Sequence, residues 1–573
     1  MNRYPTIKFL VERGNAVALV VGLLPLLGGL VLAGFGLHWI VIVAGVVAAC
    51  VLYVLMRSYI ELVRVISDML IPSETAPTSE LPSTRQASTA SVESVSTGRV
   101  RQVAGGNSGE FDVVVVGGGL GGLSTACRAA QLGMKVAVLE RGIDTQYVCN
   151  SRFSGGILHI NGHNVEEPVE DLVRAIDELT LGHADKDLAQ ALALDARRAV
   201  KWLSEEGAKY VRVGQIVWQQ HVLAPPRPIT PGLDWKGRGP DITLRTLEEN
   251  LRQRGSVLHR GAIARELMES QGRCVGVQAE VDGRPIDFRA GAVVIADGGF
   301  QANLDYIGKH FAPAPSKIKQ RGAATGMGDG LRMAQAMGAA VTDLDAFYGH
   351  MLSRDSFHND KVWPYPQLDE LGTAGIVIDD RGERITDEGM GGIYVANMIA
   401  RLADPLSTWA VFDEDVWNGP GKNARIPANP NLVKAGGVVH QANSLRELAE
   451  LINVPAERFE LTVAGYNQAL AAGTLSCLRP ARSSMRIKAM PIGKPPYYAV
   501  PLCAGITYTM GGIAIDPHGQ VRRASGGSIQ GLYAVGAATG GLEGGSGIGY
   551  VGGLIKAATF GIRAAESIGQ ASR

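Results

Sequence analysis

Residues 112–125 read Asp-Val-Val-Val-Val-Gly-Gly-Gly-Leu-Gly-Gly-Leu-Ser-Thr, and this stretch decides the fold class. The four valines predict a buried parallel strand, after which Gly117, Gly119 and Gly122 take the positions of a GxGxxG motif. In such a motif the first glycine permits the turn, the second lets the backbone approach a pyrophosphate, and the third lets helix and strand pack closely. The stretch therefore predicts a strand, a phosphate-binding turn and the start of a helix.

The residues that follow support dinucleotide binding. A helical pattern continues from Leu123 to Leu132, and residues 135–140, Lys-Val-Ala-Val-Leu-Glu, predict a second strand that ends in an acid. A carboxylate at this place accepts hydrogen bonds from ribose hydroxyls. A lone GxGxxG motif also fits a purely structural glycine turn, but the complete βαβ unit ending in Glu140 favours a nucleotide site.

The composition allows a large globular body and indicates no charged partner. With 573 residues and 46% hydrophobic content, we expect two domains and an extra segment. Lys and Arg together number 55, as do Asp and Glu, so no nucleic-acid partner is expected. The six cysteines have no CxxC spacing, so we expect reduced thiols in a cytoplasmic body and no metal site.

The N-terminal region has the composition of a membrane anchor. From Ala16 to Met56 the sequence has no charged residue apart from a histidine, which is enough for two spans of about 20 residues each. Basic residues on both sides place both ends of the hairpin, and the main body, in the cytoplasm. We expect a two-helix transmembrane hairpin over residues 1–70 and a flexible linker over residues 71–110. The alternative is a buried apolar hairpin of a soluble protein.

Four further segments resemble a known family: the FAD-dependent oxidoreductases that include fumarate reductase and succinate dehydrogenase flavoprotein subunits, 3-ketosteroid dehydrogenases and tricarballylate dehydrogenase. The segments are residues 292–300 (AVVIADGGF), 325–330 (TGMGDG), 509–516 (TMGGIAID) and 531–541 (GLYAVGAATGG). The resemblance implies an α/β fold with a Rossmann-like FAD-binding domain that is split in sequence by an inserted α+β cap domain. The FAD-binding parts would cover residues 111–343 and 492–573, and the cap residues 344–491.

The resemblance also implies which residues hold the cofactor. Residues 150–156, Asn-Ser-Arg-Phe-Ser-Gly-Gly, are similar to the family's flavin-contacting turn but lack the histidine that attaches FAD covalently in succinate dehydrogenases. FAD is therefore expected to bind non-covalently. The implied cofactor-binding residues are Gly117, Gly119, Gly122, Glu140, Ser154, Gly155, Gly156, Ala262, Asp329, Gly536, Gly547 and Ile548.

The chain departs from the fumarate-reducing members of the family at the substrate side. Tyr508 stands where those members have a histidine before Thr-Met-Gly-Gly, and their two substrate-binding arginines fall on Gly392 and Gly547. An arginine–carboxylate fork is the strong way to hold a dicarboxylate, so these losses argue against fumarate or succinate as substrate. The closing Gly-Gly-Ser-Gly pattern is closer to the tricarballylate dehydrogenase branch.

Four residues are candidates for catalysis, each with a structural alternative. Tyr508 has a phenol that can donate or accept a proton, or simply pack in a strand. His350 lies where relatives have a substrate-side histidine, and Tyr498 belongs to a segment that leads back to the FAD domain. Burial would raise the pKa of Glu543 toward the working range of a base. Alternatively, Glu543 is an acid at a helix N-terminus, which the helix dipole favours. Arg152 and Arg354 are candidate anion or carbonyl contacts.

The expected function is that of an FAD-dependent dehydrogenase or reductase. It would act on a CH–CH bond next to a carbonyl or carboxyl group of a small-molecule substrate, by hydride transfer at flavin N5. A membrane quinone or another electron carrier would exchange electrons with the flavin. One alternative is a 3-ketosteroid-type dehydrogenase, which the tyrosines favour. Another is a non-catalytic flavin-binding membrane redox adaptor, which the missing arginines and histidine favour.

Overall fold

The computed structural model of the chain describes residues 21, 23–28, 31, 42–56, 100–102, 110–214 and 219–571. Residues 94–573 form a compact unit that is separate from residues 1–93. Residues 23–28 and 42–56 are helical, but most of the predicted transmembrane hairpin over residues 1–70 lies outside the described residues. In the described part of the chain, no helix is both long enough and apolar enough to cross a bilayer.

A mixed sheet around β2 (Phe111–Val116) forms the centre of the body. β2 lies between β3 (Val136–Glu140) and β9 (Arg284–Ile295) and runs parallel to both. Val113, Val114 and Val115 are fully buried because both faces of the sheet are covered, which is why four valines occur in a row. The other strands of this sheet are β1 (Val100–Gln102), β6 (Val257–Arg260), β7 (Ala262–Ser270), β8 (Arg273–Val281), β16 (Gln520–Arg522) and β17 (Ser528–Ala534).

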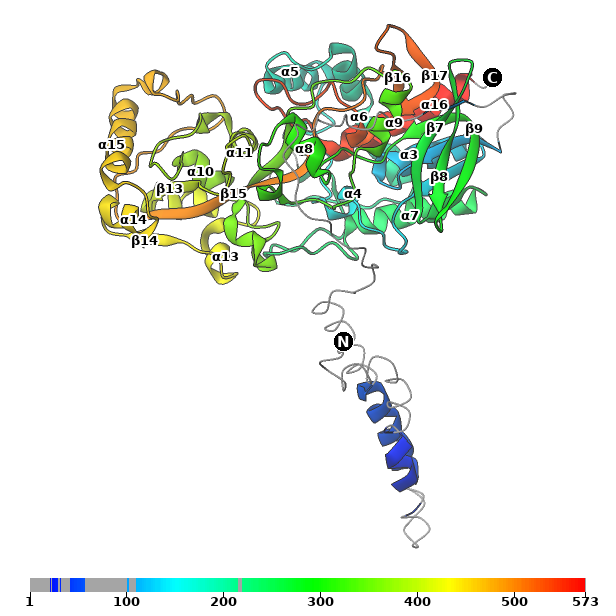
Figure 1. The fold of residues 1–573 in the computed structure, drawn as a ribbon, viewed down its shortest axis with the longest axis horizontal. Coiled ribbons are helices and arrows are strands. Elements are labelled where there is room, and N and C mark those ends of the chain that lie inside the picture. Colours follow the sequence, from blue (N-terminus) through cyan, green and yellow to red (C-terminus); the bar gives the residue numbers. More distant parts are fainter. Residues whose placement is uncertain are drawn as a thin grey trace, which may run out of the picture. The chain divides into compact units, whose positions relative to one another are not determined.

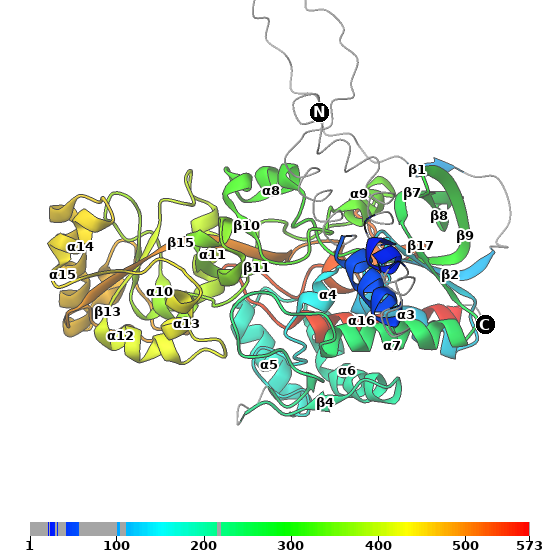
Figure 2. The same ribbon diagram turned by 90° about the horizontal axis from the view of Figure 1, so that it is seen from below.

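The chain returns to this sheet near its C-terminus. β17 pairs in parallel with β9, on the far side of the cap in sequence. This confirms the predicted α/β fold with a split FAD-binding domain. The helices of the body are α3 (Leu120–Gln131), α4 (Asn150–Phe153), α5 (Val169–Thr180), α6 (Lys186–Glu205), α7 (Gly239–Gln253), α8 (Leu304–His310), α9 (Asp329–Ala336) and α16 (Gly553–Ala571), of which α3, α7 and α16 lie side by side (Figures 1 and 2).

One end of the expected linker is part of the sheet. Residues 100–102, which we assigned to a flexible segment over residues 71–110, form β1 and pair in parallel with Leu267, Met268 and Glu269 of β7. Without β1, β7 would be an edge strand, with unpaired N–H and C=O groups that any extended segment can bond. The composition of the segment does not reveal this pairing, and most of the rest of the linker lies outside the described residues.

A second sheet belongs to the cap and is built on β15 (Tyr497–Thr509). This strand runs from the cap helices α14 and α15 toward the body (Figure 1). Its partners are β10 (Lys319–Gln320), β11 (Phe347–Ser353), β13 (Trp409–Asp413) and β14 (His440–Ala442), and β12 (Ile376–Ile378) pairs with β13. The second sheet therefore contains strands from outside the predicted cap range of 344–491. The cap helices are α10 (Asp369–Ala374), α11 (Gly392–Ala400), α12 (Glu414–Asn418), α13 (Ala428–Lys434), α14 (Leu445–Leu451) and α15 (Ala456–Ala472).

A β-bulge lies where β11 meets β15. Tyr348 pairs with Tyr508, but the next residue, Gly349, pairs with Ile506, so Thr507 is an extra residue on β15. Such a bulge lets two consecutive residues turn toward the same side of a strand. Thr507 and Tyr508 both line the cavity described below.

Candidate active site

A cavity of about 700 Å³ extends from the glycine-rich turn of the body to the cap. Its lining includes the start of α3, the end of β3, the loop before β15 and side chains from β11 and α11. Clefts between domains, with a few polar groups on an apolar wall, are typical of cofactor and substrate sites.

The glycine-rich turn has the geometry that a pyrophosphate needs. Gly117 has a positive φ of 106°, a conformation that favours glycine. A Cβ on Gly119 would meet only Ser151 Oγ, at 3.4 Å, so this glycine faces open space. A Cβ on Gly122 would instead lie 2.0 Å from the carbonyl oxygen of Gly117, so Gly122 lets the helix approach the strand. Each glycine thus has the role that the motif predicts.

Glu140 is fixed at the end of β3. Its Oε2 accepts a hydrogen bond from the N–H of Gly118 at 2.8 Å, and its Oε1 accepts one from the N–H of Gly142 at 2.7 Å. Burial raises the pKa of Glu140, and these two N–H groups act in the opposite direction. Each carboxylate oxygen keeps a free lone pair, so the residue can still accept a ribose hydroxyl. Glu140 and the open cradle at Gly119 fit the adenosine half of FAD.

The other predicted cofactor residues fall into two groups. Ser154, Gly155, Gly156, Asp329 and Gly536 line the cavity. Four residues lie outside the lining: Gly122 packs α3 on β2, Ala262 immediately precedes the lining residues Ile263 and Ala264, Gly547 packs against Leu179 and Arg486, and Ile548 packs against Ala346 and Met510.

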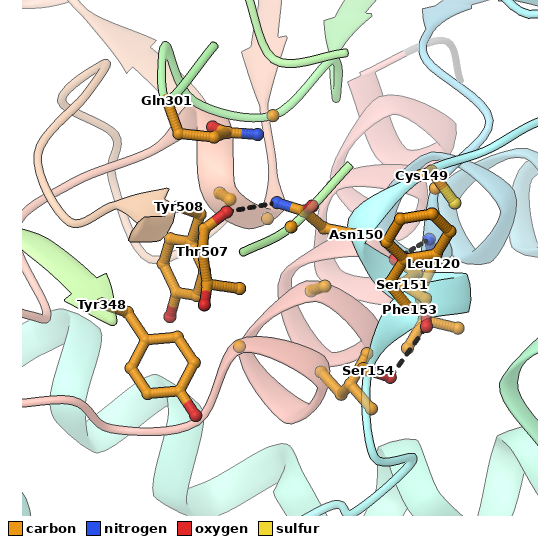
Figure 3. Close-up of a pocket in the computed structure, with 18 of the residues that line it drawn as sticks. Leu120, Cys149, Asn150, Ser151, Phe153, Ser154, Gln301, Tyr348, Thr507 and Tyr508 are labelled. Atoms are coloured by element: carbon orange, nitrogen blue, oxygen red, sulfur yellow. Dashed lines mark hydrogen bonds between the residues drawn. The ribbon is translucent and has the colours of Figure 1, made fainter. Parts of the chain in front are cut away.

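Three tyrosine rings, Tyr348, Tyr508 and Tyr550, form one wall of the cavity. The rings of Tyr348 and Tyr550 are stacked, with centroids 3.8 Å apart and an interplanar angle of 13°. Tyr508 lies 5.4 Å from Tyr348, and Figure 3 shows these two rings next to each other. In the same view, Asn150 donates a hydrogen bond to the carbonyl oxygen of Thr507, beside Tyr508, at 2.8 Å (Figure 3). The wall is therefore an aromatic surface that carries three phenol hydroxyl groups.

His350 links one of these phenols to an acid. Its Nε2 lies 3.1 Å from the hydroxyl of Tyr348, and its Nδ1 is hydrogen-bonded to Asp369 Oδ2. Burial lowers the pKa of His350, and Asp369 opposes this shift only in part. The imidazole is therefore neutral near pH 7, with Nδ1 donating to Asp369 and Nε2 accepting from Tyr348. The side chain of Asp369 is 18% exposed, so the chain of groups reaches water.

Glu543 is hydrogen-bonded to the phenol of Tyr508. Its two oxygens accept the hydroxyl of Tyr508 at 2.9 and 3.0 Å, and it forms an ion pair with Lys556 Nζ. Both charged side chains are almost completely buried. Burial, followed by the charge of Glu543, raises the pKa of Tyr508 well above that of a free tyrosine. Tyr508 thus stays protonated, and Glu543 acts through it because Glu543 itself is not part of the cavity lining.

Three candidate residues lie away from the cavity lining. Tyr498 stacks on Phe412 in the cap and donates its hydroxyl to Glu414 at 2.5 Å. Arg354 lies 4.7 Å from the Trp409 ring centroid and donates to a backbone carbonyl.

Arg152 is fully buried and forms an ion pair with Asp241. The structure gives these three residues packing roles, because each already has a partner within the protein.

Several residues that line the cavity or support its wall were missed in the sequence. Tyr348 is two positions before His350, and a strand places such residues on one face, so this signal was present. Lys556 is the only charged residue in the apolar stretch 551–562, which also indicated a buried partner. Asp297 lines the cavity with one oxygen bonded to the N–H of Gly330 at 2.7 Å, and burial raises its pKa to about 7. Arg227, Arg321 and Arg425 also line it, and nothing in their local sequences marked them.

Comparison with known proteins identifies the family. The family model described as "FAD binding domain" matches residues 112–549. The chain belongs to this FAD-binding family. It is an FAD-dependent oxidoreductase, and the match spans the glycine-rich turn, the cap and the closing segment.

Curated relatives and solved structures of the FAD-binding family cover most of the body. A probable fumarate reductase of Shewanella frigidimarina is 26% identical over 460 residues, covering 78% of this chain and 72% of the relative. A vinyl phenol reductase of Lactiplantibacillus plantarum is 23% identical over 467 residues, covering 76% and 91%. The structure of a 3-ketosteroid-Δ4-(5α)-dehydrogenase from Rhodococcus jostii matches with a TM-score of 0.62 at 22% identity, over 82% of this chain and 99% of that chain. This last similarity shows the fold.

Proposed function

We propose that this oxidoreductase, which acts on CH–CH bonds, adds or removes hydrogen across a carbon–carbon bond next to a carbonyl or carboxyl group. The observation that carries the proposal is the connected set Tyr348, His350 and Asp369 at the cavity wall. Such a reaction needs a hydride carrier for one carbon and a proton-handling group for its neighbour. When bound, FAD supplies the hydride chemistry.

The tyrosine, histidine and aspartate handle the proton. In dehydrogenation, Tyr348 Oη accepts a proton from the substrate carbon while its own proton passes to His350 Nε2. The imidazolium that forms is stabilised by Asp369, which is hydrogen-bonded to Nδ1. In hydrogenation the same groups work in reverse, and Tyr348 gives its proton to the substrate. Burial raises the pKa of Tyr348 to about 12, so the phenol is protonated before the reaction begins.

Tyr550 is suited to polarising a substrate carbonyl. The N–H of Gly553 donates to the hydroxyl of Tyr550 at 3.1 Å, which leaves the phenol proton of Tyr550 free to point into the cavity. Tyr508 donates its one phenol proton to Glu543, so its ring contributes to the wall but its hydroxyl has no proton left for a substrate. A phenol that donates to a carbonyl oxygen stabilises the negative charge that develops there when the neighbouring bond reacts.

The test uses rapid mixing of the purified flavoprotein without oxygen. Flavin reduced by dithionite is mixed with acrylate, urocanate, 4-vinylphenol or an unsaturated ketosteroid, and flavin reoxidation is followed by absorbance. We expect at least one compound to react, and Tyr348→Phe to slow the reaction by about 10²–10⁴-fold with unchanged FAD content. Tyr497→Phe is the control, because its hydroxyl donates to the carbonyl oxygen of Gly493 and lies outside the cavity lining. Equal rates in Tyr348→Phe and wild type would refute the proton role.

The finer features of the cofactor and the cellular context are also proposals. FAD is held non-covalently, so acid precipitation should release all of it from the protein. The N-terminal apolar run anchors the chain in a membrane with the body in the cytoplasm, and electrons pass to or from a quinone or another carrier. The composition of residues 16–56 supports this arrangement. Recovery of the full-length protein in the supernatant after cell lysis and ultracentrifugation would contradict the anchor.

A further inference from the structure

A group of arginines that the sequence did not reveal lines the cavity near the tyrosine wall. Arg227 comes from the loop after β5 (Val222–Leu223), Arg321 directly follows β10, and Arg425 precedes α13. Arg227 and Arg321 lie over the ring of Tyr365, at 4.3 and 5.1 Å from its centroid. Arg425 donates a hydrogen bond to the carbonyl oxygen of Arg227 at 3.0 Å, which ties the two segments together. Three positive charges from distant parts of the chain therefore meet at one place.

These charges have no carboxylate partner. Across the described ranges, none of the three arginines is within ion-pair distance of an Asp or Glu side chain. Arg227 and Arg321 are 6% and 7% exposed, and Arg227 Nε and Nη1 and Arg321 Nε have no hydrogen-bond partner there. Asp234, which is close enough to influence Arg227, is itself paired with Arg238. Buried unpaired charge is costly, so such a group is typical of a site whose anionic partner is a ligand.

The groups around the arginines respond to this positive charge. Burial lowers the pKa of Arg227, and the charges of Arg321 and Arg425 lower it further. Burial alone would raise the pKa of Tyr365, but the three guanidinium groups outweigh burial and lower it. Each shift reports an excess of positive charge that an incoming anion would relieve.

The arginines lie close to the groups that we propose to carry the chemistry. Arg321 Nη1 donates to Thr507 Oγ1 at 2.8 Å, and Thr507 is the bulge residue next to Tyr508. The charge of Arg321 also lowers the pKa of Tyr348 against the effect of burial. Of the other lining arginines, Arg486 is bonded to two backbone carbonyls, and Arg141 lies with Asp329 at the nucleotide end. The three arginines are thus connected to the tyrosine wall through the contact of Arg321 with Thr507.

We infer that Arg227, Arg321 and Arg425 form an anion-binding subsite and that the substrate is a monocarboxylate with an aromatic or apolar body. Guanidinium groups are the usual partners of a carboxylate, and the rings of Tyr348, Tyr508 and Tyr550 cover a flat apolar surface. The three arginines lie at positions other than Gly392 and Gly547, where the fumarate-reducing members have theirs. The three arginines alone support the carboxylate-binding subsite. That its ligand is the substrate rests on the proposed function.

The test compares two probes of similar shape, the anion cyclohexanecarboxylate and the neutral cyclohexanecarboxamide. Binding of each to the oxidised flavoprotein is measured by isothermal titration calorimetry, which does not depend on turnover. We expect the carboxylate to bind at least about 10-fold more tightly than the amide. Arg227→Gln and Arg425→Gln should each weaken carboxylate binding by about 10- to 100-fold and leave amide binding nearly unchanged. Arg227→Lys should recover part of the affinity because it keeps the charge.

The control is Arg354→Gln, which removes another guanidinium that stacks on an aromatic ring and donates to a carbonyl, but outside the cavity lining. It should bind both probes as the wild type does. Flavin absorbance and circular dichroism check that each variant is folded and loaded. Equal affinity for the two probes in the wild type, or equal losses for both probes in the arginine variants, would overturn the subsite. Preserved carboxylate binding with no reaction toward any unsaturated compound would overturn the proposed function and leave the subsite standing.

Discussion

Replacing Glu543 by glutamine tests the most deeply buried charge pair near the cavity. Glu543 and Lys556 are 2% and 1% exposed, and Glu543 also accepts the hydroxyl of Tyr508 and the N–H of Val551. Glu543→Gln keeps the shape of the side chain but leaves the ammonium group of Lys556 without its counter-charge. Removing one partner of such a pair costs about 3–5 kcal/mol. We therefore expect the free energy of unfolding in urea, measured with excess FAD and followed by circular dichroism, to fall by that amount.

Two further variants serve as comparisons for this prediction. Glu543→Gln combined with Lys556→Met removes both charges but keeps an acceptor for the Tyr508 hydroxyl and the N–H of Val551, so it should recover most of the loss. Glu205→Gln removes a partner of Lys201 in a pair whose side chains are 60% and 78% exposed, and should change stability by less than about 1 kcal/mol. If Glu543→Gln were as mild as Glu205→Gln, the pair would not be the buried ion pair described here.

Three more predictions concern the cofactor end of the cavity. Gly119→Ala should keep the fold but lower the FAD-to-protein ratio, since its Cβ would occupy the open cradle, whereas Gly122→Ala should reduce soluble yield because its Cβ meets backbone at 2.0 Å. Glu140→Ala should weaken FAD binding by about 10-fold or more, measured by fluorescence titration of the apoprotein. Burial raises the pKa of Asp297 to about 7 from 3.8, so its carboxyl disfavours folding increasingly as pH rises from about 4 to about 7. Asp297→Asn should therefore lose less stability than the wild type over that range, by up to about 4 kcal/mol in urea titrations, and identical pH profiles would exclude this assignment.

The nucleotide half of the site could be predicted because its residues are close together in sequence. The strand, the turn and the acid of one βαβ unit lie within residues 111–140, and local periodicity is enough to place them. His350 and Tyr508 were also placed in the cavity, since each belongs to a segment with a recognisable motif.

The substrate half of the site could not be predicted, because the length of a strand and the contacts between loops determine which residues line it. Tyr498 and Tyr508 are both tyrosines of β15, but ten residues of extended strand separate them by roughly 33 Å, so one lies in the cap and the other in the cavity. Arg227, Arg321 and Arg425 come from three loops that only the folded chain brings together. Loops of this kind leave no periodic signal in a single sequence.

The extra residue on β15 has a consequence for how this pocket diversifies. Because Thr507 is an extra residue, the alternation of side chains between the two faces of β15 shifts by one position between its cap half and its cavity half. Deleting Thr507 would remove the bulge and the hydroxyl that Arg321 contacts, while Ile506 and Tyr508 could keep their partners Gly349 and Tyr348. A one-residue deletion or insertion could thus remove or add one cavity-lining side chain of β15 in one genetic step. Comparisons between relatives should therefore allow a gap at this position before equating the residue that precedes Thr509-Met-Gly-Gly.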